Sequence, residues 1–178
     1  MEAERHGFCG MRTANESERL ARMPTVTASA RARYATGNKE FHDFFAATLQ
    51  SARREILEYV EPEGGADPYD PPILEAFADA AEAGIEVKII VREEDAKKVA
   101  RANRDNPDVA RAAPYVGKNY LFKYVDKVHS PFTVIDGEKV VLHLRDPREP
   151  EEYYSSVCIE DEAFAHEMRA VFFEVWNS

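Results

Sequence analysis

The sequence predicts an α/β fold in which helices sandwich a mixed β-sheet. Three observations carry this prediction. The first half of the chain alternates segments of helical apolar spacing with short β-type runs. Two later β-type runs flank Asp136-Gly137, which is a strong signal for a tight hairpin. An amphipathic segment closes the chain. Helix–strand alternation favours parallel strands and a hairpin adds antiparallel ones, so the sheet is expected to be mixed.

The first half of the chain predicts a helix, a strand, a loop and a second helix. Asn38 is a suitable N-cap, and apolar residues follow at spacings of three and four over residues 41–52. Residues 56–60 form a short β-type run. Residues 61–72 hold four acidic residues, two glycines and four prolines, which is the composition of a loop. Its last two prolines open the next helix, which Gly84 is expected to end.

The middle of the chain predicts a strand, a polar helix and a further strand. Residues 85–91 are apolar enough to be buried on both faces of the sheet. Residues 95–106 have the pattern of a polar helix, which the following Pro107 closes. We expect irregular structure after it, with a helical turn over residues 108–112, and then a strand over residues 120–125.

The last third predicts three strands and a helix. Residues 132–135 and 139–144 are the two arms of the Asp-Gly hairpin. Residues 145–152 form a charged loop, and residues 153–159 form another strand. Asp161 then caps a final helix with a continuous apolar stripe.

The chain is expected to hold one domain and a tail. With 178 residues, it can bury a core without disulfides or metal. Residues 1–24 mix charges with few large apolar residues, and we interpret them as a flexible or weakly docked tail with a short helix over residues 16–23. The alternative is the remnant of a lost or separately encoded domain. The domain itself is expected over residues 25–178.

Composition narrows the classes of function. The formal net charge of −10 argues against a general binder of the phosphate backbone, although it allows a small local anion site. Two cysteines are too few for a disulfide framework or a zinc site and suit a reducing compartment. No apolar run is long enough to span a membrane, and the first ten residues do not form a secretory signal. A cytoplasmic location without membrane partners is therefore expected.

The segment from His129 to Asp136 carries the most chemical information. A histidine and an aspartate seven positions apart bracket a predicted strand. This spacing resembles the His-x-Lys-x-x-x-x-Asp motif of the phospholipase D superfamily. The order of elements is similar too, in SARREILEYV, in ILEAFADAAEAGIEVKIIV and in the closing HEMRAVFFEVW. The resemblance covers about residues 38–177 and implies a phospholipase D-like fold.

The resemblance also shows where this chain departs from the catalytic members. It gives His129 the position of the nucleophile and Asp136 that of the motif aspartate. The position of the lysine, which neutralises phosphate oxygens in those enzymes, holds Pro131. The Gly-Ser positions after the next strand fall on His143 and Leu144. Loss of one preorganised positive group costs about 3 kcal/mol of transition-state stabilisation, so we expect no phosphodiester chemistry.

Each motif residue also has a structural interpretation. Asp136 is favoured as a turn residue, because aspartate before glycine suits a tight turn. His129 and His143 are favoured as structural residues. If they face each other across the hairpin, they could bind a ligand or metal or form a pH-sensitive pair. We expect no metal, because no third ligand has suitable spacing.

The degenerate motif is most similar to the effector-binding domains of TrmB-type archaeal transcription regulators. These are phospholipase D-like units without the catalytic set, and they sense small molecules. The resemblance therefore implies a ligand cleft where loops follow the carboxyl ends of strands. The residues expected to line it are Tyr59, Glu61, Arg92, Lys118, His129 and His143.

Three functions follow, in order of preference. The first is a non-catalytic sensor or regulatory domain that binds a small polar ligand, without cofactor, as a homodimer. The second is a phosphodiesterase or nuclease that uses His129, supported by Asp136, across a dimer axis. The third is a protein-interaction module whose acidic surface meets a basic partner. The tail is too short for the winged DNA-binding domain of TrmB-type regulators, so direct nucleic-acid binding is not expected.

Overall fold

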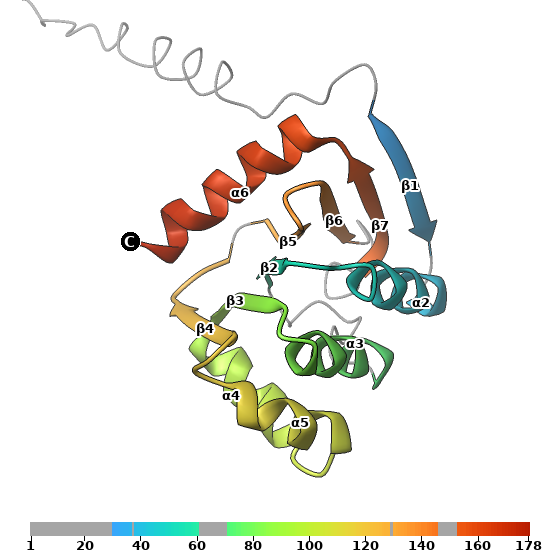
Figure 1. The fold of residues 1–178 in the computed structure, drawn as a ribbon. Coiled ribbons are helices and arrows are strands. Elements are labelled where there is room, and N and C mark those ends of the chain that lie inside the picture. The colour runs from blue at the N-terminus through green and yellow to red at the C-terminus, as the bar shows by residue number, and fades with distance from the viewer. Residues whose placement is uncertain (1–29, 37, 61–70, 129, 146–152) are drawn as a thin grey trace, which may run out of the picture.

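The computed structural model describes residues 30–36, 38–60, 71–128, 130–145 and 153–178. Helices pack on both faces of a seven-stranded mixed sheet (Figure 1). The strands are β1 (Arg31–Thr36), β2 (Glu55–Tyr59), β3 (Glu86–Arg92), β4 (Tyr120–Val125), β5 (Phe132–Ile135), β6 (Lys139–Arg145) and β7 (Tyr153–Glu160). The helices are α2 (Asn38–Leu49), α3 (Pro71–Glu82), α4 (Glu93–Ala102), α5 (Pro107–Ala112), the 3₁₀ helix η1 (Ala113–Tyr115) and α6 (Glu162–Trp176).

The strand order is β1-β7-β6-β5-β2-β3-β4. Strands β2, β3 and β4 are parallel, because helices connect them. Strands β2, β5, β6, β7 and β1 pair antiparallel in that order. The predicted mixed sheet between helices is therefore confirmed.

The sheet separates two apolar cores. One lies under α2 and α3 and is centred on Phe41, Phe45, Phe77 and Ile56. The other lies under α6, where Phe172 and Phe164 pack on alternate residues of β2 and β5. Figure 1 shows α6 on one side of the sheet and α2 with α3 on the other. Side chains alternate between the two faces along each strand, so each strand residue can be assigned to one core.

The predicted hairpin forms as expected. Asp136 and Gly137 have φ angles of 57° and 68°. Positive φ at both central positions suits a type I′ turn, across which the N–H of Glu138 donates to the carbonyl of Ile135 at 3.0 Å, and Asp-Gly tolerates this conformation. The turn sets the register of β5 and β6, in which Ile135 faces Lys139.

The polar helix is shorter than predicted. Instead of continuing to residue 106, α4 ends at Ala102, and a separate helix α5 begins at Pro107. A residue before proline avoids the helical conformation, and Asn106 accordingly has ψ 126°. Its side chain accepts the backbone N–H of Asp108 at 2.8 Å, so it caps α5 rather than ending α4.

Strand β1 was not predicted. It is the edge strand next to β7, and of its six residues only Ala35 is buried. Arg33 of β1 forms an ion pair with Glu160 of β7 at 3.0 Å. An exposed edge strand needs no apolar alternation, so residues 31–36 carry no pattern that sequence analysis could detect. The predicted tail, including the short helix over residues 16–23, lies outside the described residues.

Candidate functional site

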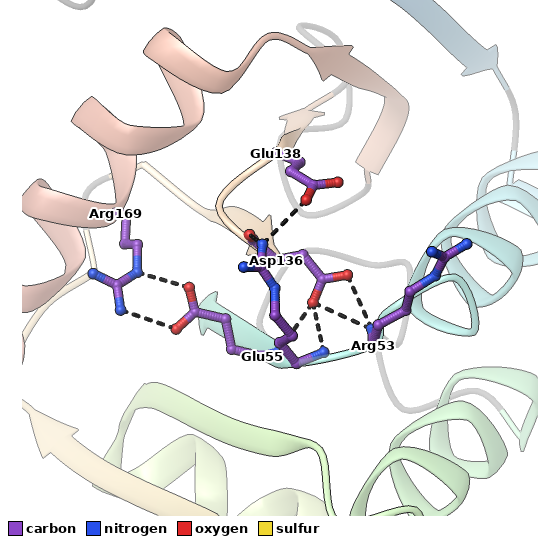
Figure 2. A network of polar contacts seen from close by, with 6 residues as sticks. Arg53, Glu55, Asp136, Glu138 and Arg169 are labelled. Atoms are coloured by element: carbon purple, nitrogen blue, oxygen red, sulfur yellow. Dashed lines mark hydrogen bonds and ion pairs between the residues drawn. The ribbon is translucent and has the colours of Figure 1, made fainter.

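The carboxylate of Asp136, the residue that the resemblance aligns with the motif aspartate, is hydrogen-bonded to backbone N–H groups. It accepts the backbone N–H groups of Arg53, Arg54 and Glu55, at 2.9, 2.8 and 3.1 Å. These donors lie where the chain enters β2, more than 80 residues earlier (Figure 2). The side chain is 9% exposed. Asp136 therefore occupies the β5–β6 turn and also ties this turn to the start of β2.

A polar network surrounds this turn. The Arg54 guanidinium donates to the backbone oxygen of Asp136 and to Glu138, the latter at 3.1 Å. From α6, Arg169 donates to both carboxylate oxygens of Glu55, at 2.7 and 3.2 Å (Figure 2). An open cleft of about 630 Å³ lies among these side chains. Because Arg54 and Arg169 already face carboxylates, this cleft is poorly suited to a phosphate group.

A row of buried polar residues crosses the sheet on the face covered by α2 and α3. Its members lie on β2, β5, β6 and β7: Glu58, Thr133, His143 and Ser156, with exposed fractions of 1%, 0%, 8% and 0%. Glu58 faces Thr133 across β2 and β5, and His143 faces Ser156 across β6 and β7. The hydroxyl of Thr133 lies 3.3 Å from Nε2 of His143. The row therefore continues across four neighbouring strands.

His143 is enclosed by aromatic rings of α2. Its ring contacts Phe45 edge to face, with 4.7 Å between centroids, and Phe41 at 5.5 Å. Burial lowers the pKa of His143 from 6.5 to about 3, because the charged imidazolium would lose its hydration. The imidazole is thus neutral at neutral pH. It therefore supplies no positive charge to this row.

Glu58 is the other ionisable member of the row. Burial raises its pKa from 4.5 to about 8, so it is mostly protonated at neutral pH. Among the described residues, its Oε2 atom has no hydrogen-bond partner, and the same holds for the hydroxyl of Ser156. Sequence analysis missed Glu58, although a glutamate inside the apolar run of residues 56–60 was a signal for it.

The structure brings together only part of the predicted cleft. Tyr59 and Arg92 lie at the carboxyl ends of the parallel strands β2 and β3, so both are at the same end of these strands. The Tyr59 hydroxyl donates to the backbone oxygen of Lys127 at 3.3 Å, and Arg92 donates to Asp95 at 2.6 Å. Lys118 is exposed at the opposite end of the strands, because β4 starts at Tyr120 and runs parallel to β3.

The remaining predicted residues are Glu61 and His129, which lie outside the described part of the chain. Pro131, at the lysine position, is described, and its carbonyl accepts the N–H of His143 at 3.4 Å. No three His, Cys, Asp or Glu residues in the described ranges gather into a group that could hold a metal ion. Within the same ranges, no helix has the length and apolar character of a membrane span.

The sheet order and the helices on its two faces define a phospholipase D-like fold. Residues 33–178 match the model of the family described as domain of unknown function DUF7436, and the chain belongs to this family. No curated protein matches the sequence.

Solved structures support the fold. TrmBL2, described as an archaeal chromatin protein with a novel mode of DNA binding, superposes with a TM-score of 0.63 at 21% identity over 92% of this chain. This chain spans 59% of the length of TrmBL2. Nuc from Salmonella typhimurium, a phospholipase D family member, gives 0.56 at 17% identity, over 84% of this chain and 94% of its own.

A third structure, NucT from Helicobacter pylori, gives a TM-score of 0.55 at 17% identity, over 84% of this chain and 98% of its own. The predicted resemblance to phospholipase D-like and TrmB-type proteins is confirmed at the level of the fold.

Proposed function

We propose that this chain is a non-catalytic phospholipase D-like regulatory domain that senses a small polar ligand. The observation that carries this proposal is that the buried polar row of Glu58, Thr133, His143 and Ser156 and the neighbouring Pro131 include no lysine or arginine. Pro131 stands at the position that the resemblance gives to the motif lysine, and its carbonyl accepts the N–H of His143. Burial shifts the pKa values of His143 and Glu58 towards the uncharged forms at neutral pH. Phosphoryl transfer needs preorganised positive charge around the phosphate oxygens. A neutral polar row is better suited to hydrogen bonding than to this chemistry.

The ligand is proposed to bind at the carboxyl ends of β2 and β3, where Tyr59 and Arg92 lie. Both side chains are held by neighbouring groups, Tyr59 by the backbone of Lys127 and Arg92 by Asp95. Asp95 is 1% exposed, so its partner is held close to the sheet. A ligand at these strand ends would meet one hydroxyl and one guanidinium in fixed positions, a combination that recognises hydroxyl or carbonyl oxygens.

TrmBL2 is described as a DNA-binding chromatin protein, and the likeness in fold supports a role connected with chromatin for this chain. The net charge of −10 supports an indirect one, because a protein that binds the phosphate backbone gathers positive charge. Such a domain would act on a partner or on a second copy of itself. The homodimer expected from the sequence belongs to this proposal, and sedimentation of the full chain would test it.

Two experiments test the proposal. The first measures hydrolysis of bis(p-nitrophenyl) phosphate by the full chain from pH 5 to 9. We expect no turnover above buffer and no difference between the chain and its His129→Ala variant. Hydrolysis that disappears in His129→Ala would overturn the non-catalytic assignment in favour of the phosphodiesterase.

The second is a thermal-shift screen against sugars, polyols and nucleosides. A ligand present at 100 times its Kd stabilises a protein by about 2.7 kcal/mol, which raises Tm by about 5–10 °C for a domain of this size. Tyr59→Phe and Arg92→Ala are expected to reduce the shift at fixed ligand concentration. Lys118→Ala, at the opposite end of the strands, is the matched control and should retain it. If no compound in these classes raises Tm, the sensor proposal fails.

A further inference from the structure

An apolar pocket lies at the β4 edge of the sheet, between that strand and helices α4 and α5. Its volume is about 280 Å³. Its floor is Phe77 of α3, and its sheet side includes Val91. These residues belong to the core under α2 and α3, whereas the Tyr59 side chain belongs to the core under α6. The pocket is therefore separate from the ligand site proposed above at Tyr59 and Arg92.

One wall of the pocket is aromatic. Phe77 and Tyr120 are stacked at 6.3 Å between ring centroids, and Phe122 follows Tyr120 at 5.1 Å. The wall continues outward through Tyr124. Val116, Phe122 and Tyr124 are 53%, 36% and 55% exposed, although each is large and apolar. Contiguous exposed apolar side chains around a hollow are a common mark of a binding site.

The opposite wall consists of small side chains. Helix α4 contributes Ala96, Val99 and Ala100, and α5 contributes Val109. Protein interiors usually fill such space to close-packed density. Small residues on the helices and large rings on the sheet side leave this space unfilled, and a planar ring would be able to stack on the aromatic wall.

The pocket offers no charge to a ligand. Of the described residues that line it, only Asp108 and the two tyrosines Tyr120 and Tyr124 are ionisable. Asp108 accepts from the Arg111 guanidinium at 3.0 Å, so its charge is already compensated. Burial raises the pKa of Tyr120, so its phenol stays neutral. Binding a charged molecule here would cost its hydration without a compensating partner.

We propose that this pocket binds a small neutral aromatic molecule of about two fused rings. The volume, the aromatic lining and the absence of an uncompensated charge among the described lining residues support this occupant together. An apolar cavity of about 150 Å³ stays dry and holds benzene, and this pocket has nearly twice that volume. The aromatic wall adds ring–ring contacts. The site accounts for the exposed rings of β4, which the ligand site at Tyr59 and Arg92 does not use.

Indole is the probe that tests this site. Isothermal titration of the full chain is expected to give saturable binding at one indole per chain. The anionic indole-3-acetate should bind at least tenfold more weakly, because the pocket cannot compensate its carboxylate. Absence of saturable indole binding up to its solubility limit would overturn the proposal, and so would equal affinity for the two compounds.

Two exposed alanines of α4 give a matched pair of variants. Ala100 lines the pocket and Ala102 does not. Ala100→Phe fills the pocket and should weaken indole binding at least tenfold, whereas Ala102→Phe should change it less than twofold. If Ala100→Phe does not fold, Phe122→Ala removes part of the aromatic wall and should weaken binding at least threefold. Equal effects of Ala100→Phe and Ala102→Phe would overturn the assignment. A dimer that Ala100→Phe dissociates would overturn it as well, because a second copy would then be the occupant.

Discussion

Replacing Asp136 by alanine is expected to destabilise the protein by about 3–5 kcal/mol. The Asp136 carboxylate accepts three backbone N–H groups and is 9% exposed. Hydrogen bonds to a charged group each contribute about 1.5–3 kcal/mol, and such contributions are not fully additive. Alanine also tolerates the positive φ of this turn less well than aspartate does. Urea denaturation at pH 7 would measure the loss.

Two variants bracket this result. Asp136→Asn keeps one acceptor oxygen and tolerates the same turn, so it should cost clearly less than alanine. Glu138→Ala removes an ion pair with Arg54 whose side chains are 54% and 66% exposed, and should cost less than about 1 kcal/mol. If Asp136→Ala loses less than 1 kcal/mol, the three N–H groups find other acceptors and the structural role assigned to Asp136 is wrong.

Asp136 also illustrates how far sequence analysis reached. Asp-Gly between two apolar runs predicts the turn, because both residues must take positive φ. The donors to its carboxylate lie more than 80 residues away, and nothing local in the sequence connects them with the turn. The turn was therefore predictable from the sequence. The backbone donors to Asp136 were not, because they depend on the strand order that places β2 beside β5.

Strand direction explains why Lys118 does not join Tyr59 and Arg92. Tyr59 and Arg92 end parallel strands and lie at the same end of these strands, as expected. Lys118 precedes β4, which is parallel to β3, so it lies at the end where these strands begin. Placing Lys118 in the cleft would have required a strand that ends before it. The buried polar row of Glu58, Thr133, His143 and Ser156 was also missed. Each strand contributes one polar residue to it, and the sequence does not say which residues of other strands lie beside that residue.

The second large effect concerns the pH dependence of stability, which Glu58 and His143 should control in opposite directions. The folded-state pKa of Glu58 is raised from 4.5 to about 8, so its contribution is fully present below pH 4.5 and is lost as pH rises to about 8. The pKa of His143 is lowered from 6.5 to about 3, so its contribution is present above pH 6.5 and is lost as pH falls to about 3. Each change amounts to about 1.4 kcal/mol per pH unit and at most about 5 kcal/mol. Between pH 4.5 and 6.5 the two slopes cancel.

Glu58→Gln isolates one of these contributions, because glutamine does not titrate. The difference in unfolding free energy between Glu58→Gln and the unaltered chain should move in favour of the variant by several kcal/mol from pH 4.5 to 8. His143→Gln should show the mirror image, gaining relative to the unaltered chain as pH falls from 6.5 towards 3. Glutamine introduces amide groups that need partners, so either variant can carry a constant offset, and the slope against pH is therefore the informative quantity. Glu138→Gln, on the surface, is the control for the substitution itself.

Parallel curves for Glu58→Gln and the unaltered chain would mean that Glu58 is solvated or ionised in the folded protein. The buried polar row would then carry a charge, and the non-catalytic proposal would lose part of its support.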